Sequence, residues 1–124
     1  MLVCPKSDSH AQPARQEVVA RSLAGTEAGV VLGRSVVDSA GDDVGPLVDV
    51  LVDRDAKPVA GVIDVGGFFG IGTRRVAVAW RLLRFVPDSG ETRVLLDLTF
   101  DSAAAAPEYL GPDNTLIVID RPPP

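Results

Sequence analysis

The stretch Gly66-Gly67-Phe68-Phe69-Gly70-Ile71-Gly72-Thr73-Arg74-Arg75-Val76-Ala77-Val78-Ala79-Trp80 decides the fold of this chain. Glycines surround two phenylalanines and an isoleucine, and a run of strand-forming residues then leads straight into Trp80. Glycine reaches backbone conformations that other residues avoid, so Gly66, Gly67, Gly70 and Gly72 predict a loop with an adjustable backbone. The alternating, valine-rich residues after the loop predict a strand over 74–79.

The rest of the chain shows a series of short strands separated by turns, which is the pattern of a sandwich or barrel. Two long strands, 44–52 and 58–65, are joined by the turn 53–57 and precede the glycine loop. Gly45-Pro46 predicts a bend or bulge in the first of them, because proline has no N–H to donate to a ladder. Further strands are expected at 35–38, 82–86, 92–98 and 115–120.

One short alanine-rich helix is expected between the last two strands, from Thr99 to the residues before Pro107. Thr99 is a good N-cap, Asp101 suits the positive end of the helix dipole, and alanine has the highest helix propensity. Pro107 ends the helix, because the residue before a proline is pushed out of the helical region. The predicted fold class is therefore mainly β, a small antiparallel β-barrel with one short helix.

The alternation of apolar residues predicts which strand faces are buried. Val48, Val50 and Val52 share one face and are expected in the barrel interior, whereas Leu47 and Leu51 fall on the opposite face. A half-solvated antiparallel strand should be polar on its outer face, but here that face is apolar as well. We therefore expect the exterior to be covered in part by the helix, the N-terminal arm or a second subunit. The interior is completed by Val59, Ile63, Val65, Val76, Val78, Val94, Leu96 and Leu98.

The ends of the chain differ in composition from the middle, which predicts one domain with two tails. Residues 1–30 mix Ser, Gln, Ala, Pro and charges without sustained periodicity, and we interpret them as a flexible arm. The domain is expected to cover 31–120, and the proline-rich end 121–124 to be a disordered stub. No apolar run approaches the length of a membrane span and no secretory segment is recognisable, so we expect a cytoplasmic protein without direct membrane insertion.

Composition and charge exclude several classes of function. The net charge of −5 argues against DNA binding and disfavours RNA, because both need clustered Lys and Arg. The only histidine, His10, and the only cysteine, Cys4, both fall in the arm, so the barrel cannot assemble Ser/His/Asp or Cys/His machinery. We expect no enzyme, no cofactor and no metal site.

Two features resemble ligand sites and are better explained by local structure. The glycine loop has a spacing loosely like a dinucleotide fingerprint, but a strand follows it instead of a phosphate-binding helix. The pair Asp53-x-Asp55 has a spacing used in calcium loops, yet the glycine and the glutamate that complete such a loop are missing. Aspartate is common in turns because its side chain bonds the neighbouring backbone.

The ordered motifs of residues 31–109 resemble the PRC-barrel family, the small β-barrel of the photosynthetic reaction-centre H subunit and of a ribosome maturation factor. The resemblance rests on four motifs in order: Asp49-Val50-Leu51-Val52-Asp53, the Gly-Gly-Phe-x-Gly-Ile-Gly loop, the Val-Ala-Val-x-Trp strand end, and Ala106-Pro107-Glu108-Tyr109. The family often has glycine where Ala56 stands in the Asp-x-Asp-x turn, and this departure predicts a different turn type. The resemblance implies a barrel used for interaction or assembly, without shared catalytic residues.

We therefore predict a non-catalytic interaction or assembly module that associates with itself, as a homodimer or larger, and with an unidentified protein partner. Exposed apolar knobs usually mark contact sites, so Phe68, Phe69 and Ile71 are the predicted contacts, with Trp80 as their support. Replacing Phe68 and Phe69 by serine is expected to abolish association and leave the fold intact. Two alternatives follow from the family's contexts: an accessory subunit docking to a membrane-bound electron-transfer complex of photosynthetic type and, third, a ribosome-assembly factor.

Overall fold

The structure, a computed structural model, describes residues 15–25, 27–67, 74–88, 91–111 and 116–122. A short 3-10 helix, η2 (Trp80–Leu82), joins the fourth and fifth strands, and a short α-helix, α2 (Phe100–Ala104), follows the sixth. The strands are β1 (Ser35–Val37), β2 (Asp43–Val52), β3 (Pro58–Val65), β4 (Arg74–Ala79), β5 (Leu83–Asp88), β6 (Glu91–Leu96) and β7 (Val118–Ile119).

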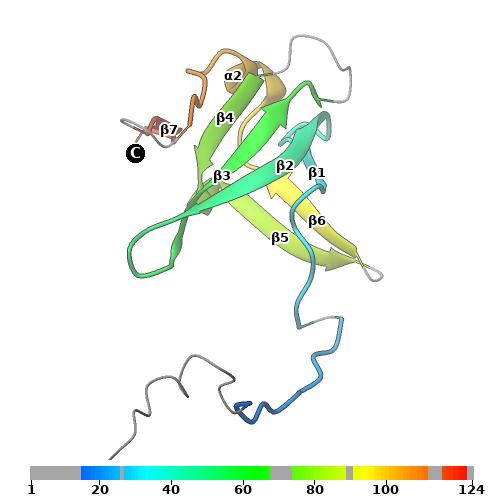
Figure 1. The fold of residues 1–124 in the computed structure, drawn as a ribbon. Coiled ribbons are helices and arrows are strands. Elements are labelled where there is room, and N and C mark those ends of the chain that lie inside the picture. The colour runs from blue at the N-terminus through cyan, green and yellow to red at the C-terminus, as the bar shows by residue number, and fades with distance from the viewer. Residues whose placement is uncertain (1–14, 26, 68–73, 89–90, 112–115, 123–124) are drawn as a thin grey trace, which may run out of the picture.

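The described strands form one sheet in the order β5-β6-β1-β2-β3-β4-β7, which curls into a half-barrel (Figure 1). This confirms the prediction of a mainly β, barrel-like domain with one short helix. The sheet is mixed, however, because β1 pairs with β6 and β4 with β7 in parallel, while the other described pairings are antiparallel. Hairpins join only antiparallel neighbours, and both parallel pairs link strands that are far apart in the sequence.

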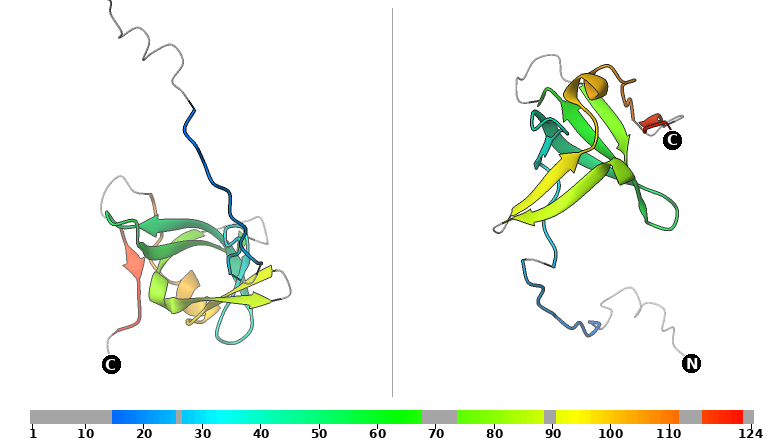
Figure 2. Two further views of the ribbon diagram at one scale, coloured as in Figure 1. Left: turned by 90° about the horizontal axis from the view of Figure 1, so that it is seen from below. Right: turned by 180° about the vertical axis from the view of Figure 1, so that it is seen from behind.

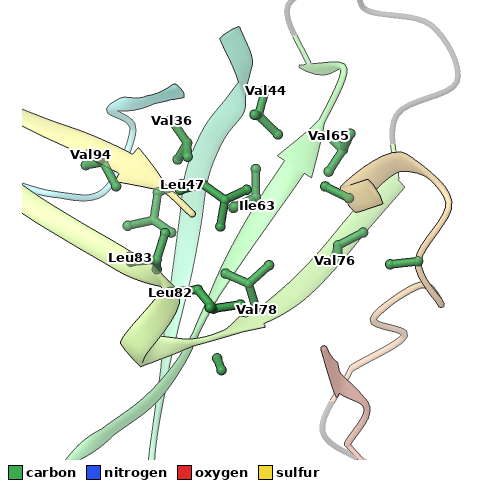
Figure 3. Packing of buried hydrophobic residues seen from close by; sticks show 14 residues of the cluster. Val36, Val44, Leu47, Ile63, Val65, Val76, Val78, Leu82, Leu83 and Val94 are labelled. Carbon is green, nitrogen blue, oxygen red and sulfur yellow. The ribbon is translucent and has the colours of Figure 1, made fainter. Parts of the chain in front are cut away.

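The main core lies inside the curl, where side chains from β1 to β6 converge (Figure 3). Leu47, Ile63, Leu82 and Leu96 are its largest fully buried side chains. Gly61 in the middle of β3 makes room for them: a Cβ there would lie 2.6 Å from Leu83 Cδ1 and 3.0 Å from Leu47 Cδ1. The core therefore depends on a residue without a side chain at this point of the sheet.

The predicted alternation in β2 is wrong over half of the strand, because the pairing with β3 shifts register between Leu47 and Asp49. A bulge adds one residue to a strand and so moves every later side chain to the other face. Leu47 is fully buried in the main core, whereas Val48 packs on the outer face. A second register shift follows between Leu51 and Val52, and Val52 is 54 % exposed. Val50 contacts the core as expected. The predicted interior residue Val59 is 40 % exposed.

The outer face of the sheet carries a second buried cluster formed by Ala60, Val62 and Ala77. Tyr109, from the segment after α2, packs against this cluster, and its amide donates a hydrogen bond to the carbonyl of Arg75 at 2.6 Å. The sequence predicted that the helix, the arm or a second subunit covers part of the outer face. In the structure, the segment after α2 of the same chain contributes to that cover.

The sequence made predictions for two local structures, the N-cap of α2 and the β2–β3 turn at Ala56, and the structure agrees with the first but not with the second. The Thr99 hydroxyl accepts a hydrogen bond from the Ser102 amide, which confirms the N-cap of α2. In the β2–β3 turn, Ala56 adopts a φ of +63°, the left-handed conformation for which glycine is preferred. The expectation of a different turn type at Ala56 was therefore wrong: alanine takes the glycine conformation, and an amide–carbonyl bond from Asp53 to Lys57 closes the turn.

The described residues of the N-terminal segment, 15–25 and 27–30, are exposed and belong to no helix or strand; they lead away from the barrel (Figure 2). Close to the barrel the segment makes contact with β6, because a Cβ on Gly29 would overlap the hydroxyl of Thr92. The apolar side chains of Val18 and Val19 are fully in solvent.

Candidate functional site

The glycine loop leaves β3 through two glycines that lie against β2. Gly66 has a φ of +78°, and its amide donates a hydrogen bond to the carbonyl of Val44 at 2.8 Å. A Cβ on Gly67 would lie 3.0 Å from Pro46 Cδ and 3.3 Å from the carboxylate of Asp64. Gly66 therefore adopts the left-handed conformation that favours glycine, and both glycines lie against neighbouring atoms at this end of the loop.

The loop returns to the sheet at Arg74, which is held from the other side. The Arg74 guanidinium donates a hydrogen bond to the carbonyl of Ala106 at 2.7 Å, and Arg75 is joined to Tyr109 through the backbone. The segment after α2 thus fixes the strand at the point where the loop ends. Phe68, Phe69, Gly70, Ile71 and Gly72 lie outside the described residues.

The base of the loop contains the buried side-chain atoms that lack a hydrogen-bond partner in the described part of the chain, Asp64 Oδ1 and Arg74 Nε. A buried polar atom without a partner costs about 1–3 kcal/mol. Both atoms lie where β3 and β4 meet the loop, since Val65 pairs with Arg74. The fold is therefore not optimised for stability at this place.

Trp80 stands at the opposite end of β4 from the loop. Its ring is half-buried, packs on the main core and lies 4.8 Å from the ring of Phe85, centroid to centroid, at 32°. A strand of six residues spans about 20 Å, so the structure does not bring Trp80 beside the described ends of the loop. Its described contacts support the core, and its part in an interaction stays a prediction.

The family model for the PRC-barrel domain matches residues 28–102. The chain belongs to the PRC-barrel family. The matched part runs through β1 to β6 and into α2, so it contains the glycine loop and Trp80, whereas β7 lies beyond it. No curated protein matches the chain. Family membership makes this domain a β-barrel module of a generally non-catalytic family.

A second feature of this PRC-barrel is an acidic hollow of about 460 Å³ between the β1–β2 turn and α2, lined by Asp38, Asp42, Asp43, Thr99, Phe100 and Asp101, among others. Asp38 is buried, and its carboxylate accepts hydrogen bonds from the amides of Asp42, Phe100 and Ala40 at 2.8, 2.8 and 2.9 Å. The bond from Asp42, with those from Phe100 and Ala40, holds the pKa of Asp38 below its ordinary value, although burial acts to raise it. Asp38 thus joins the turn to the helix.

The sequence predicts for Asp38, as for the other turn aspartates, only bonds to the neighbouring backbone. Its two local bonds are typical of an aspartate that opens a turn. Its bond to Phe100 spans 62 residues, and no local pattern signals such a contact. The buried carboxylate is therefore a junction that only the folded structure brings together.

The described ranges contain no group of three or more His, Cys, Asp or Glu side chains that could hold a metal ion. In the β2–β3 turn, Asp53 accepts hydrogen bonds from the amides of Asp55 and Lys57, which is the local bonding that the sequence predicted for turn aspartates. No helix in the described part of the chain is long and apolar enough to cross a membrane.

Proposed function

We propose that this PRC-barrel protein is a non-catalytic interaction and assembly module, which associates with itself and presents its glycine loop to a protein partner. The observation that carries the proposal is the construction of the loop's base. One end is bonded to β2 through Gly66, and the other to the segment after α2 through Arg74. A fixed base with an apolar loop sequence is the arrangement by which rigid scaffolds present binding residues.

The chemistry of the loop sequence supports a protein as the partner. Phe68, Phe69 and Ile71 offer large apolar side chains and no charge, and aromatic side chains dominate the binding energy of protein interfaces. Fixing the loop's ends lowers the conformational entropy that binding has to remove. The unsatisfied polar atoms of Asp64 and Arg74 at the base fit a site kept for binding instead of stability.

The roles of the described carboxylates support a function without catalysis. Asp38 uses both carboxylate oxygens, and Asp53 its Oδ1, to bond backbone amides, which is a structural role in turns. Asp120 and Asp97 form ion pairs with Arg81 and Arg121. These carboxylates shape turns and fix the C-terminal segment.

Support for self-association comes from the C-terminal segment. The outer face of the sheet is partly covered by Tyr109 of the same chain, so that face no longer requires a second subunit. Beyond Tyr109, however, the apolar side chains of Leu110, Leu116 and Ile117 are exposed. Clustered exposed apolar side chains on a small protein mark contact surfaces.

Affinity purification of the full chain from extracts of its host tests the proposal. The wild type is compared with a variant carrying Phe68→Ser and Phe69→Ser, and with Val52→Ser, an exposed apolar position far from the loop, as control. We expect a protein that is captured by the wild type and the control and lost by the loop variant, with equal melting temperatures. Capture of a membrane electron-transfer complex or of ribosomes would select one of the two alternatives. A capture profile unchanged by the loop variant would overturn the loop's role.

A further inference from the structure

The two edges of the described sheet differ in how they are protected against pairing with another chain. β5 forms one edge and carries Arg84 and Pro87, both exposed. A charged side chain and a proline without an N–H are the means by which natural edge strands avoid further pairing. β7 forms the other edge (Figures 1 and 2), and its residues Val118 and Ile119 include neither a charged side chain nor a proline.

The β7 edge is built from Leu116-Ile117-Val118-Ile119, which we call the C-terminal edge segment. Branched aliphatic residues of this kind favour strands. Only Val118 and Ile119 pair with β4, and Ile119 packs on the main core. Leu116 and Ile117 therefore extend the strand-forming sequence beyond the residues that pair. Leu116, Ile117 and Val118 are 42, 47 and 37 % exposed, so their apolar side chains are partly in solvent.

Two ion pairs fix the residues that follow this edge. Arg81 and Asp120 approach to 2.6 Å, and Arg121 and Asp97 to 2.9 Å. Arg81 belongs to η2 and Asp97 follows β6, so the end of the C-terminal edge segment is held against two other elements. An edge that is already ordered loses less entropy when another strand pairs with it.

We propose that the C-terminal edge segment is the self-association surface of this protein, where two copies pair their β7 strands antiparallel about a two-fold axis. The inference rests on the proposed self-association and assigns its surface. An axis at Ile117 would place Ile117 opposite the second copy's Ile117, and Leu116 opposite its Val118, so these apolar residues meet apolar ones on the same face of the sheet. A two-fold contact uses the same surface on both copies and closes at the dimer.

The charges favour a second copy as the occupant. Asp120 is the only acidic residue adjoining the paired run, and it is already neutralised by Arg81 within its own chain. In the antiparallel register, the two Asp120 side chains lie at opposite ends of the pairing, so no like charges face each other. The backbone of an unpaired edge strand supplies the hydrogen bonds for such strand addition.

The small size of the surface sets the affinity. Four residues of strand span about 13 Å. Their contact falls well below the ~800 Å² per partner of a standard interface, so we expect a weak dimer with a dissociation constant of roughly micromolar or higher. The association is therefore concentration-dependent.

Sedimentation velocity of the full chain between about 5 and 500 µM, within the range expected for the constant, tests the inference. We compare the wild type with Ile117→Lys and Leu116→Lys, and with Val52→Lys as the matched control at an exposed apolar residue away from the edge. Because the net charge is −5, an added lysine lowers general repulsion, so a loss of association reports on the edge itself. Both edge variants should raise the dissociation constant at least about tenfold.

The control should sediment like the wild type, and melting curves should show all variants folded. A wild type that stays monomeric at the highest concentration would overturn the inference. So would an edge variant that dimerises as the wild type does. If the wild type is monomeric but still captures a protein through the loop, self-association is refuted and partner binding by the loop is supported. If the edge variants abolish dimerisation but no captured protein depends on the loop, self-association is supported and partner binding by the loop is refuted.

Discussion

Replacing Ala56 by glycine is expected to stabilise the protein. Ala56 holds a φ of +63° in the β2–β3 turn and is exposed, so no packing is lost with its methyl group. A left-handed conformation costs a residue with a Cβ about 1–2 kcal/mol. Glycine removes that strain, but it raises the entropy of the unfolded chain, which returns about 0.4–1 kcal/mol. The free energy of unfolding should therefore rise by roughly 0.5–1 kcal/mol.

Thermal denaturation followed by circular dichroism measures this difference. For a domain of this size, the gain corresponds to a melting temperature about 2–6 °C higher. Ala40→Gly is the matched control, because Ala40 is also an exposed alanine in a turn but has no positive φ. Among the described non-glycine residues, only Ala56 has one. The control should lose about 0.4–1 kcal/mol. If Ala56→Gly destabilises the protein as much as Ala40→Gly does, the left-handed turn is wrong.

Three further predictions concern the core and the Asp38 junction. Gly61→Ala should lower the free energy of unfolding by about 1–3 kcal/mol, because its Cβ would press on Leu47 and Leu83; unchanged denaturant unfolding would contradict this contact. Leu47→Ala should cost about 2.7–5 kcal/mol and Val52→Ala less than about 0.5 kcal/mol; similar losses in denaturant unfolding would contradict the bulge in β2. The pKa of Asp38 is lower in the folded than in the unfolded chain, so its ionised form stabilises the fold above the ordinary pKa, and this contribution is lost as the pH falls below about 4. Asp38→Asn should therefore melt below the wild type at neutral pH, with a gap that narrows in acid; a gap constant from neutral to acidic pH would oppose this linkage.

Local patterns were sufficient for much of the fold. The bounds of β3 and β4 agree with the prediction because uninterrupted alternation and flanking turn residues both mark them. The N-cap of α2 follows from Thr99 and its neighbours alone. Each of these depends on residues close together in the chain, and side-chain period and capping chemistry act at that range.

What the sequence could not predict depends on contacts between distant segments. The bulge after Leu47 is set by pairing with β3, and because of it Leu47 and Val50 both face the main core, which an uninterrupted alternation does not allow. The prediction began the fifth strand at 82, but Leu82 belongs to η2, where its side chain is buried in the core. The parallel pairing of β1 with β6 and the bond from Asp38 to Phe100 join residues about 60 positions apart. Strand register and buried junctions of this kind are decided by tertiary packing.

The construction of the loop's base could not be predicted from the sequence. The glycines predicted a loop from Gly66, where the backbone has a φ of +78°, but nothing in their spacing indicated that Arg74 would bond the backbone after α2. Trp80 was predicted to support the loop because it is near in sequence, and the length of β4 lies between Trp80 and the described end of the loop at Arg74. The exposed C-terminal edge segment was expected as an ordinary last strand, because a valine- and isoleucine-rich run does not show from sequence which of its sides will find a partner.

Hydrogen exchange read by mass spectrometry at two protein concentrations tests the central claim, self-association through the C-terminal edge segment, most directly. The concentrations should lie far apart within the range expected for the dissociation constant, at about 5 and about 500 µM. The account predicts slower exchange at Leu116–Ile119 in the concentrated sample, with the amides of the β2–β3 turn unchanged. Equal exchange at Leu116–Ile119 in both samples would contradict it.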